Sequence, residues 1–435
     1  MTPPVDQAAA ARSQIRRGIR ERLTSWISDK ELSREFWMFF VAALCFDFGF
    51  AMFLFLYNLL LLDIGFNERL LGLVAGAMTL GSMVGTIPIG MLVQRVGLRR
   101  VLSVGFLATA LISALRTFVA GEYTQIGLAF VAGTFLCIWA VCFSPAAAKL
   151  TTEKNRTFAF SLLFSVGIGT GALGGLAGGF LPGWLQAVVP SLGTADAKRV
   201  VLLLCCGIVA LGIWPVRRLK LAAVKETNGR WRLDPFLLRF LPAVALWSMV
   251  AGSFMPFATA YLSRKIHVPL AHIGVIFSAS QLAQLVAVLL APAVFRRCGL
   301  VAGIMYTQLA TAVALSALAR AHGLTVIVAM YLSFTAFHWM GSPGIYSLLM
   351  NRVEEEGRGI ASAACSLVTS LGQAIASATA GAAYVAFGYS PVFLAVACVA
   401  ALAAVLFWVL LREKSVGAGD AAALLNTPDV NVYEQ

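Results

Sequence analysis

The sequence predicts an all-α membrane protein with twelve transmembrane helices in two six-helix lobes. Of its 435 residues, 60% are hydrophobic and only 12% are charged, and the mean hydropathy is +0.84. Charged residues make up about a quarter of an ordinary soluble domain. Twelve bilayer-crossing helices of about 20 residues each would use nearly all of the apolar sequence. The polar remainder is too short for a separate catalytic domain, so we do not expect an enzyme.

Twelve apolar stretches, separated by charged or Pro/Gly-rich breaks, match this number. The first six span residues 36–62, 69–93, 101–120, 125–149, 158–186 and 199–215. The second six span residues 236–262, 270–294, 300–320, 325–349, 359–386 and 391–411. No small-residue cleavage site follows the arginine-rich start at signal-peptide distance, so we expect the first stretch to be a retained membrane helix.

Lysine and arginine are distributed unevenly between the two sides of these helices. With both termini cytoplasmic, 26 of the 33 basic residues fall in cytoplasmic segments and 7 on the other side. Basic loops stay in the cytoplasm during insertion, so this bias predicts cytoplasmic termini in a multi-pass protein of the cell (inner) membrane. The net charge of +13 is spread along the membrane and not gathered on one soluble face, so we expect no nucleic-acid binding.

The stretches and breaks divide the chain into five segments. The segments are a cytoplasmic N-terminal segment (1–35), a six-helix lobe (36–216), a cytoplasmic linker (217–235), a second six-helix lobe (236–411) and a cytoplasmic tail (412–435). In the first segment, apolar residues recur at helical spacing opposite arginines, which predicts an amphipathic helix on the inner leaflet. These apolar residues are Ile15, Ile19, Leu23, Trp26 and Ile27.

The two lobes are related by an internal repeat. A shift of 202 residues places Gly72 on Gly274 and Gly97 on Gly299. Parallel halves of this kind occur in transporters that hold their substrate near the bilayer midplane, between the halves. We therefore expect a substrate site between the lobes.

The loop after the second stretch carries a family motif. It reads Gly90-Met91-Leu92-Val93-Gln94-Arg95-Val96-Gly97-Leu98-Arg99-Arg100 and resembles the G-x-L-x-D-R-x-G-R-R loop of the major facilitator superfamily. With the twelve helices, the linker and the repeat, the resemblance covers nearly the whole chain. It implies the major facilitator fold and a loop that helps to latch the cytoplasmic gate.

The gate set that this resemblance implies contains Gly90, Gln94, Arg95, Gly97, Arg99, Arg100 and, from the second half, Arg297. Gln94 stands where the family has an acid. The resemblance therefore implies a latch that is weakened or rebuilt.

The fifth stretch is rich in glycine, and two interpretations of it stay open. Its glycines are Gly167, Gly169, Gly171, Gly174, Gly175, Gly178 and Gly179. Small residues let helices approach closely, so plain packing explains them. The pattern is also similar to the glycine motif of the superfamily's proton-linked efflux antiporters, although that motif's central proline is absent.

Asp47 is the one acidic residue that the sequence places deep inside an apolar stretch. It lies about 11 residues past the helix start, roughly 16 Å deep at 1.5 Å per residue. A carboxylate there should face a cavity or a partner, and burial favours its protonated form. We expect Asp47 to carry protons or to contact a cationic substrate group. The alternative is a purely structural hydrogen bond to a neighbouring helix.

His338, in the middle of the tenth stretch, is the second proton-coupling candidate. An imidazole exchanges protons near neutral pH. The structural alternative is a hydrogen bond to a backbone carbonyl freed by Pro343. If both stretches face a central cavity, as the resemblance implies, Asp47 and His338 come from opposite lobes, and their separation changes as the lobes move.

Further polar residues are expected either to line the substrate site or to join helices by hydrogen bonds. The substrate-binding candidates are Asn58, Trp139, Gln281, Gln284, Ser366, Ser370 and Gln373, with Ser144 as a further polar position. Gln281 and Gln284 share one helical face, and the two serines share a face with Gln373.

Three other features receive structural interpretations. Arg116 is expected to extend to the membrane surface. The eight cysteines lie mostly in apolar stretches and are interpreted as small buried hydrophobes, not disulfides. The sequence contains no phosphate loop and no recognisable metal box, so we expect no cofactor and no resident metal. Convergence of Cys45, Asp47, His338 and Met340 on a metal ion is the minor alternative.

Together these features predict a secondary active transporter that works by alternating access. The expected substrate is a small neutral, amphipathic or cationic organic solute, with protons as the coupling ion and efflux as one direction. Small-molecule substrate, protons and membrane lipids are the expected partners of a monomer. The alternatives are a lipid scramblase or sensor of the same fold without active transport, or a metal-ion carrier.

Overall fold

The structure is a computed structural model that describes residues 32–220, 235–354 and 357–411. The expected amphipathic helix, most of the linker and the tail after Leu411 lie outside the described residues. Within the described ranges, all regular secondary structure is helical, and twelve helices are long and apolar enough to cross a membrane. The predicted fold class is thereby confirmed.

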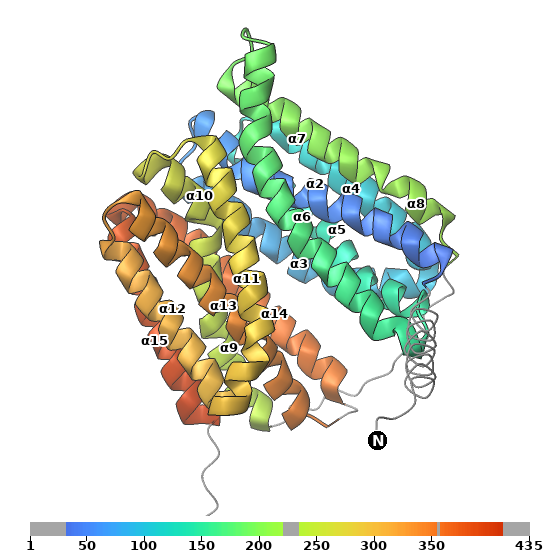
Figure 1. Cartoon of the computed structure of the whole chain (residues 1–435). Coiled ribbons are helices and arrows are strands. Elements are labelled where there is room, and N and C mark those ends of the chain that lie inside the picture. Colours follow the sequence, from blue (N-terminus) through green and yellow to red (C-terminus); the bar gives the residue numbers. More distant parts are fainter. Residues whose placement is uncertain (1–31, 221–234, 355–356, 412–435) are drawn as a thin grey trace, which may run out of the picture.

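The first lobe, residues 34–218, contains the first six spans (Figure 1). Its elements are α2 (Arg34–Asp63), α3 (Glu68–Val96), α4 (Leu98–Phe118), α5 (Glu122–Lys149), α6 (Glu153–Val188), α7 (Thr194–Leu211) and α8 (Ile213–Arg218). The short break between α7 and α8 falls at Gly212, and the two together form the sixth span.

The second lobe, residues 235–411, contains the other six spans. Its seventh span is interrupted and consists of α9 (Pro235–Phe254), the 3₁₀ turn η1 (Met255–Phe257), α10 (Ala258–Ala260) and the π-helical turn η2 (Tyr261–Lys265). The remaining helices are α11 (Leu270–Cys298), α12 (Leu300–Arg320), α13 (Leu324–Arg352), α14 (Arg358–Phe387) and α15 (Tyr389–Leu411).

The first two spans begin at polar capping residues. The Ser33 hydroxyl accepts a hydrogen bond of 3.1 Å from Phe36 N at the start of α2, and the Asn67 side chain accepts one of 3.3 Å from Leu70 N at the start of α3. Such side chains satisfy backbone donors that the first helical turn leaves without a partner. The observed spans end within about five residues of the predicted stretches.

The repeat is visible in the helices themselves. α11 and α12 begin 202 residues after α3 and α4 (270 against 68, and 300 against 98). A single glycine joins each pair, and Gly97 and Gly299 have φ values of 92° and 80°. Glycine adopts this region without the steric cost that a side chain imposes, so each helix can follow its predecessor with no longer loop.

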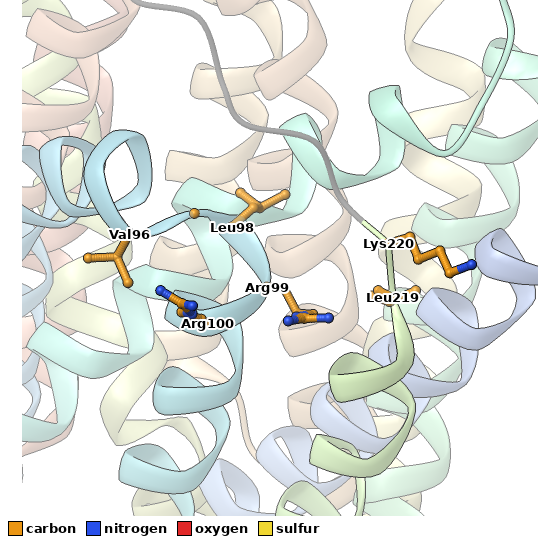
Figure 2. A pocket seen from close by; sticks show the side chains of 7 residues that line it. Val96, Leu98, Arg99, Arg100, Leu219 and Lys220 are labelled. Atoms are coloured by element: carbon orange, nitrogen blue, oxygen red, sulfur yellow. The ribbon is translucent and has the colours of Figure 1, made fainter.

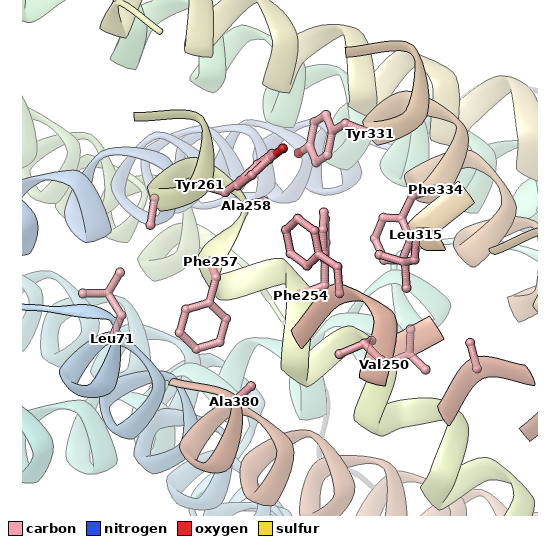
Figure 3. Packing of buried hydrophobic residues seen from close by; sticks show 14 of the residues in the cluster. Leu71, Val250, Phe254, Phe257, Ala258, Tyr261, Leu315, Tyr331, Phe334 and Ala380 are labelled. Atoms are coloured by element: carbon pink, nitrogen blue, oxygen red, sulfur yellow. The ribbon is translucent and has the colours of Figure 1, made fainter. Parts of the chain in front are cut away.

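The two lobes touch mainly along two pairs of helices, α3 with α14 and α6 with α11, with smaller contacts of α2 with α10 and of α3 with η1. The ribbons of the lobes converge near α10 and diverge toward the opposite end of the bundle (Figure 1). Figure 3 shows Leu71 of α3 in the same apolar cluster as Phe257 and Ala380 of the second lobe. We call the end formed by residues 63–68 and 254–270 the closed end, and the end formed by residues 94–100 and 296–300 the far end.

Candidate functional site

Asp47 lies half-buried on α2, between α5 and α6 of its own lobe. Its Oδ1 accepts a hydrogen bond of 3.1 Å from Trp139 Nε1 on α5. Its Oδ2 is 3.8 Å from the position that a Cβ would take at Gly167 on α6. Within the described residues the carboxylate therefore has one polar partner, and the missing side chain at Gly167 leaves space beside its second oxygen.

Aromatic rings fix the indole that contacts Asp47. The ring of Trp139 stacks on Phe46 at a centroid distance of 4.8 Å, with Phe143 at 5.2 Å and Phe106 at 5.6 Å in edge-to-face contact. Packed aromatic rings of this kind hold a defined orientation. The Nε1–H donor is consequently aimed at the carboxylate by packing within the first lobe.

One of two hydrogen-bonded glutamines of the second lobe packs against the same face of α6. Gln281 on α11 packs its amide nitrogen against Gly171, and Gln284 Nε2 donates a hydrogen bond of 2.9 Å to Gln281 Oε1. Gly171 lies one helical turn from Gly167, where Asp47 packs. The predicted shared face of the glutamines is confirmed, and Asp47 and Gln281 border one strip of α6 from opposite lobes.

Close helix packing accounts for most of the remaining glycines of α6. A Cβ at Gly179 would lie 3.0 Å from Gly274 Cα in the second lobe, and a Cβ at Gly174 would lie 2.9 Å from Met52 N on α2. α6 therefore approaches a helix of each lobe along its glycines. The packing interpretation of this stretch agrees with these contacts.

Asn58 joins the lobes at the closed end. It lies three helical turns from Asp47 on the same face of α2, and its Nδ2 donates a hydrogen bond of 2.9 Å to Pro256 O in η1. Asp47 thus lies on the face of α2 whose closed-end part contacts the other lobe.

The break in the seventh span leaves backbone carbonyls without their usual helical donors. Pro256 has no N–H, so Gly252 O loses its helical donor. The Ser377 hydroxyl on α14 replaces that donor at 2.9 Å, and the Tyr384 hydroxyl donates to Ser253 O at 2.8 Å. Side chains of α14 therefore stabilise the interrupted helix.

An ionic cluster, which we call the closed-end latch, also connects the lobes. Glu68 on α3 accepts a hydrogen bond of 2.9 Å from the Tyr389 hydroxyl and pairs with Arg264 at 3.6 Å. Arg264 also donates to Phe66 O at 2.8 Å and to Leu62 O at 3.3 Å. Sequence reasoning missed this cluster because Glu68 is an ordinary first-turn acid and its partners lie far along the chain.

His338 lies inside the second lobe and is nearly fully buried. Its ring stacks on Trp247 of α9 at 4.6 Å and on Phe334 of its own helix at 5.7 Å. Its Nδ1 has no hydrogen-bond partner among the described residues. Its ring contacts come from its own lobe, so nothing in this packing brings it to Asp47.

The other substrate-binding candidates are more dispersed. Gln373 on α14 places its backbone against Gly252, while Ser370 is half-buried and Ser366 is exposed on the same helix. Ser144 is exposed near the far end. The structure gathers Asp47 with Trp139, and Gln281 with Gln284, but gives no comparable grouping for the serines.

The basic residues of the motif loop are exposed at the far end. They are Arg95, Arg99 and Arg100. Gln94 of the same loop and Arg297 of the second half are exposed as well. A Cβ added at Gly90 would meet no other atom within 4 Å, and Gly97 forms the turn between α3 and α4. α4, which carries two of these arginines, packs against α5, α7, α8 and α3, all in its own lobe.

Arg116 does not reach the membrane surface, so that prediction is wrong. Its side chain is only 3% exposed, and its guanidinium carbon lies 4.3 Å from the centroid of the Tyr57 ring. Tyr57 donates to Gln125, whose Nε2 donates to Arg116 O at 2.9 Å. A cation over an aromatic face is attracted by the ring's charge distribution, which lets the arginine remain inside the lobe.

Metal-ligating side chains do not cluster in the described part of the chain. No group of three His, Cys, Asp or Glu residues lies close enough there to hold a metal ion. Cys45, Asp47 and His338 accordingly form no such group.

The fold and this interlobe arrangement define a multi-pass membrane transport protein. Residues 39–237 and 240–428 match the Major Facilitator Superfamily, and the chain belongs to that family. The resemblance of the motif loop is thereby confirmed at the level of the family.

Solved structures of transporters share this fold at low sequence identity. The nucleoside transporter NupG has a TM-score of 0.71 and 11% identity, with 88% of this chain and 100% of that chain covered. A bacterial homologue of the human lysosomal transporter Spinster has a TM-score of 0.69 and 14% identity, with 87% of this chain and 97% of that chain covered. The D-xylose–proton symporter has a TM-score of 0.68 and 16% identity, with 87% of this chain and 98% of that chain covered. No curated protein matches the sequence.

Proposed function

We propose that the protein is a proton-coupled secondary active transporter in which Asp47 carries the proton. The observation that carries this proposal is the placement of the carboxylate on the interlobe face of α2, held by Trp139 and bordered by the glycine face of α6. A membrane potential adds about 2.3 kcal/mol per charge per 100 mV, which is ample to drive such a cycle.

The proposed substrate is a small neutral, amphipathic or cationic organic solute that binds between the lobes near Asp47, Gln281 and Gln284. Amides recognise polar groups and a carboxylate recognises a cationic one, while the rings around Trp139 offer an apolar wall. Similar folds occur in transporters of nucleosides and of D-xylose, which supports a small organic substrate.

The proposed cycle is alternating access, with the lobes rocking about this site. With the termini in the cytoplasm of the cell (inner) membrane, as the basic loops predict, the closed end faces outward and the described conformation opens inward. The protein acts as a monomer in this proposal, and export is its proposed direction because the α6 glycines are similar to the glycine motif of the efflux antiporters.

The test begins with thermal unfolding of the purified protein against a panel of nucleosides, pentoses and organic amines. A bound compound raises the melting temperature by mass action. The compound that does so is then offered to proteoliposomes with an imposed pH gradient. We expect gradient-driven flux that is lost in Asp47→Asn, while exchange without a gradient persists.

The matched control is Asp196→Asn, which removes an exposed carboxylate paired with Arg199 on the surface of α7. It should leave gradient-driven flux unchanged. Unchanged flux in Asp47→Asn would remove Asp47 from the coupling role. Flux that ignores the pH gradient in the unmodified protein, accompanied by loss of lipid asymmetry, would favour the scramblase instead.

A further inference from the structure

A basic pocket of about 610 Å³ lies at the far end of the first lobe. It opens where α3 ends, α4 begins and the chain leaves α8 (Figure 2). Arg99 and Arg100 line it from α4, and Lys220 lines it from the segment after α8. Leu98 and Leu219 supply its apolar part, and both side chains are buried. The pocket therefore combines three cations with an apolar floor.

No carboxylate of the described residues neutralises these three cations. Arg99, Arg100 and Lys220 are exposed, and none of them forms an ion pair within the described ranges. Gln94 occupies the nearby position at which the related loop has an acid. Among the described residues the pocket thus offers three cations without a partner and can accept an anion.

The start of α4 adds to the positive potential of the pocket. No side chain caps the helix at Gly97, and its first turn contains no acidic residue. The backbone donors of a helix N-terminus and its dipole favour an anion. The dipole thereby reinforces the attraction that the three side chains exert.

An exposed apolar stripe runs along α4 from the pocket toward the closed end. Val104, Leu107, Leu111 and Leu115 follow Arg100 at helical spacing, and they are 53%, 43%, 61% and 51% exposed. Because the packing partners of α4 belong to its own lobe, this stripe faces away from the other lobe. In a spanning helix, such a face meets lipid chains.

We propose that this pocket binds the phosphate of an anionic phospholipid, whose acyl chains lie along the α4 stripe. Basic pockets at the membrane surface bind anionic head groups, and the cations here meet an apolar track at the ends of three spans. A soluble phosphate compound would use the cations but not the stripe. The pocket is separate from the interlobe site, so the proposal is independent of proton coupling.

The test compares lipid retention by the full chain and a triple variant, Arg99→Gln, Arg100→Gln and Lys220→Gln. Protein is purified from membranes containing phosphatidylglycerol and phosphatidylcholine, and bound lipids are counted by native mass spectrometry. We expect one retained phosphatidylglycerol, lost in the variant. Each basic side chain contributes severalfold to such binding, so the affinity should fall by more than about tenfold.

Two further variants separate charge loss from misfolding. Arg296→Gln with Arg297→Gln removes exposed charges from the repeat-related loop of the second lobe and should retain the lipid. Arg99→Lys with Arg100→Lys keeps the charge and should retain most of the binding. A Leu107→Asn, Leu111→Asn variant should weaken retention of the lipid through the stripe.

Three outcomes would overturn the proposal. The first is equal phosphatidylglycerol retention by the triple variant and the unmodified chain. The second is retention of phosphatidylcholine and phosphatidylglycerol without preference. The third is displacement of the lipid by millimolar inorganic phosphate with no effect of the Leu107 and Leu111 substitutions, which would assign the pocket to a soluble anion.

Discussion

The carboxylate of Asp47 and the indole of Trp139 form a hydrogen bond of 3.1 Å that joins α2 to α5 within the first lobe. The bond holds the acid from its own lobe and leaves its second oxygen beside Gly167. A group that is positioned by one lobe but borders the interface with the other can meet a substrate without depending on both lobes for its orientation.

Replacing Trp139 with Phe should destabilise the protein specifically through Asp47. The substitution keeps an aromatic ring but removes the donor, and loss of a hydrogen bond costs about 0.5–1.5 kcal/mol with a neutral acceptor and about 1.5–3 kcal/mol with an ionised one. Thermal unfolding in detergent should show this loss for Trp139→Phe. The exposed Trp184 offers a control, Trp184→Phe, which should have little effect.

In an Asp47→Ala background, the Trp139→Phe substitution should cost less, because its partner is already absent. A double-mutant cycle measures this coupling. Strict additivity of the two substitutions would show that the bond contributes nothing to stability.

Removing the Glu68 carboxylate or the Tyr389 hydroxyl should open the closed end. Glu68→Gln weakens the ion pair with Arg264, and Tyr389→Phe removes the bond to Glu68. A charge-assisted hydrogen bond contributes about 1.5–3 kcal/mol, so the open-to-closed ratio at this end should rise at least about tenfold.

Pulsed electron paramagnetic resonance can measure this change with spin labels at Tyr123→Cys and Leu324→Cys, which are exposed positions of the two lobes near the closed end. The background carries Cys298→Ser and Cys398→Ser, because both thiols are exposed. The variants should gain a longer distance component. Arg199→Gln, which breaks only a surface pair, should not, and an unchanged distribution in all variants would argue against the latch.

Adding a methyl group at Gly72 should force the lobes apart. A Cβ there would collide with Ser377 O and lie 3.1 Å from Gly381 Cα in the second lobe. Overpacking typically costs about 1–3 kcal/mol. Thermal unfolding should therefore show a lower melting temperature for Gly72→Ala.

The control for this substitution is Gly127→Ala on α5, where an added Cβ meets nothing within 4 Å. Alanine favours a helix over glycine by about 0.8–1 kcal/mol, so Gly127→Ala should hold or raise the melting temperature. Equal stabilisation by both substitutions would contradict the tight contact between α3 and α14.

Cysteine labelling should establish the orientation of the chain. Cys298 is exposed at the far end, which the distribution of basic residues predicts to be cytoplasmic. In a Cys398→Ser background, a membrane-impermeant maleimide should label Cys298 only after cells are permeabilised. Tyr123→Cys should be labelled in intact cells, and the reverse pattern would place the termini outside.

The sequence was sufficient to predict the spans, because bilayer thickness fixes how long an apolar helix must be. It also made Asp47 a candidate for the site, since a charged group inside such a helix needs a physical reason. It could not predict that Arg116 stays inside the lobe over the Tyr57 ring. A long side chain near a helix end can extend to the membrane surface or pack inside the protein, and only tertiary packing decides between the two. The partners of Glu68 were hidden for the same reason, since hydropathy carries no information about which helix ends meet.

The interrupted seventh span has a consequence for the energy of opening. Asn58 supplies a donor to Pro256 O from the other lobe, whereas the carbonyls of residues 252 and 253 are bonded within the second lobe. When the lobes part, water can take over as donor to Pro256 O, so that carbonyl need not be left unsatisfied. Because water can replace the interlobe hydrogen bond, the closed and open conformations of this end can differ in free energy by only a few kcal/mol. In that range a small bound molecule can shift their populations.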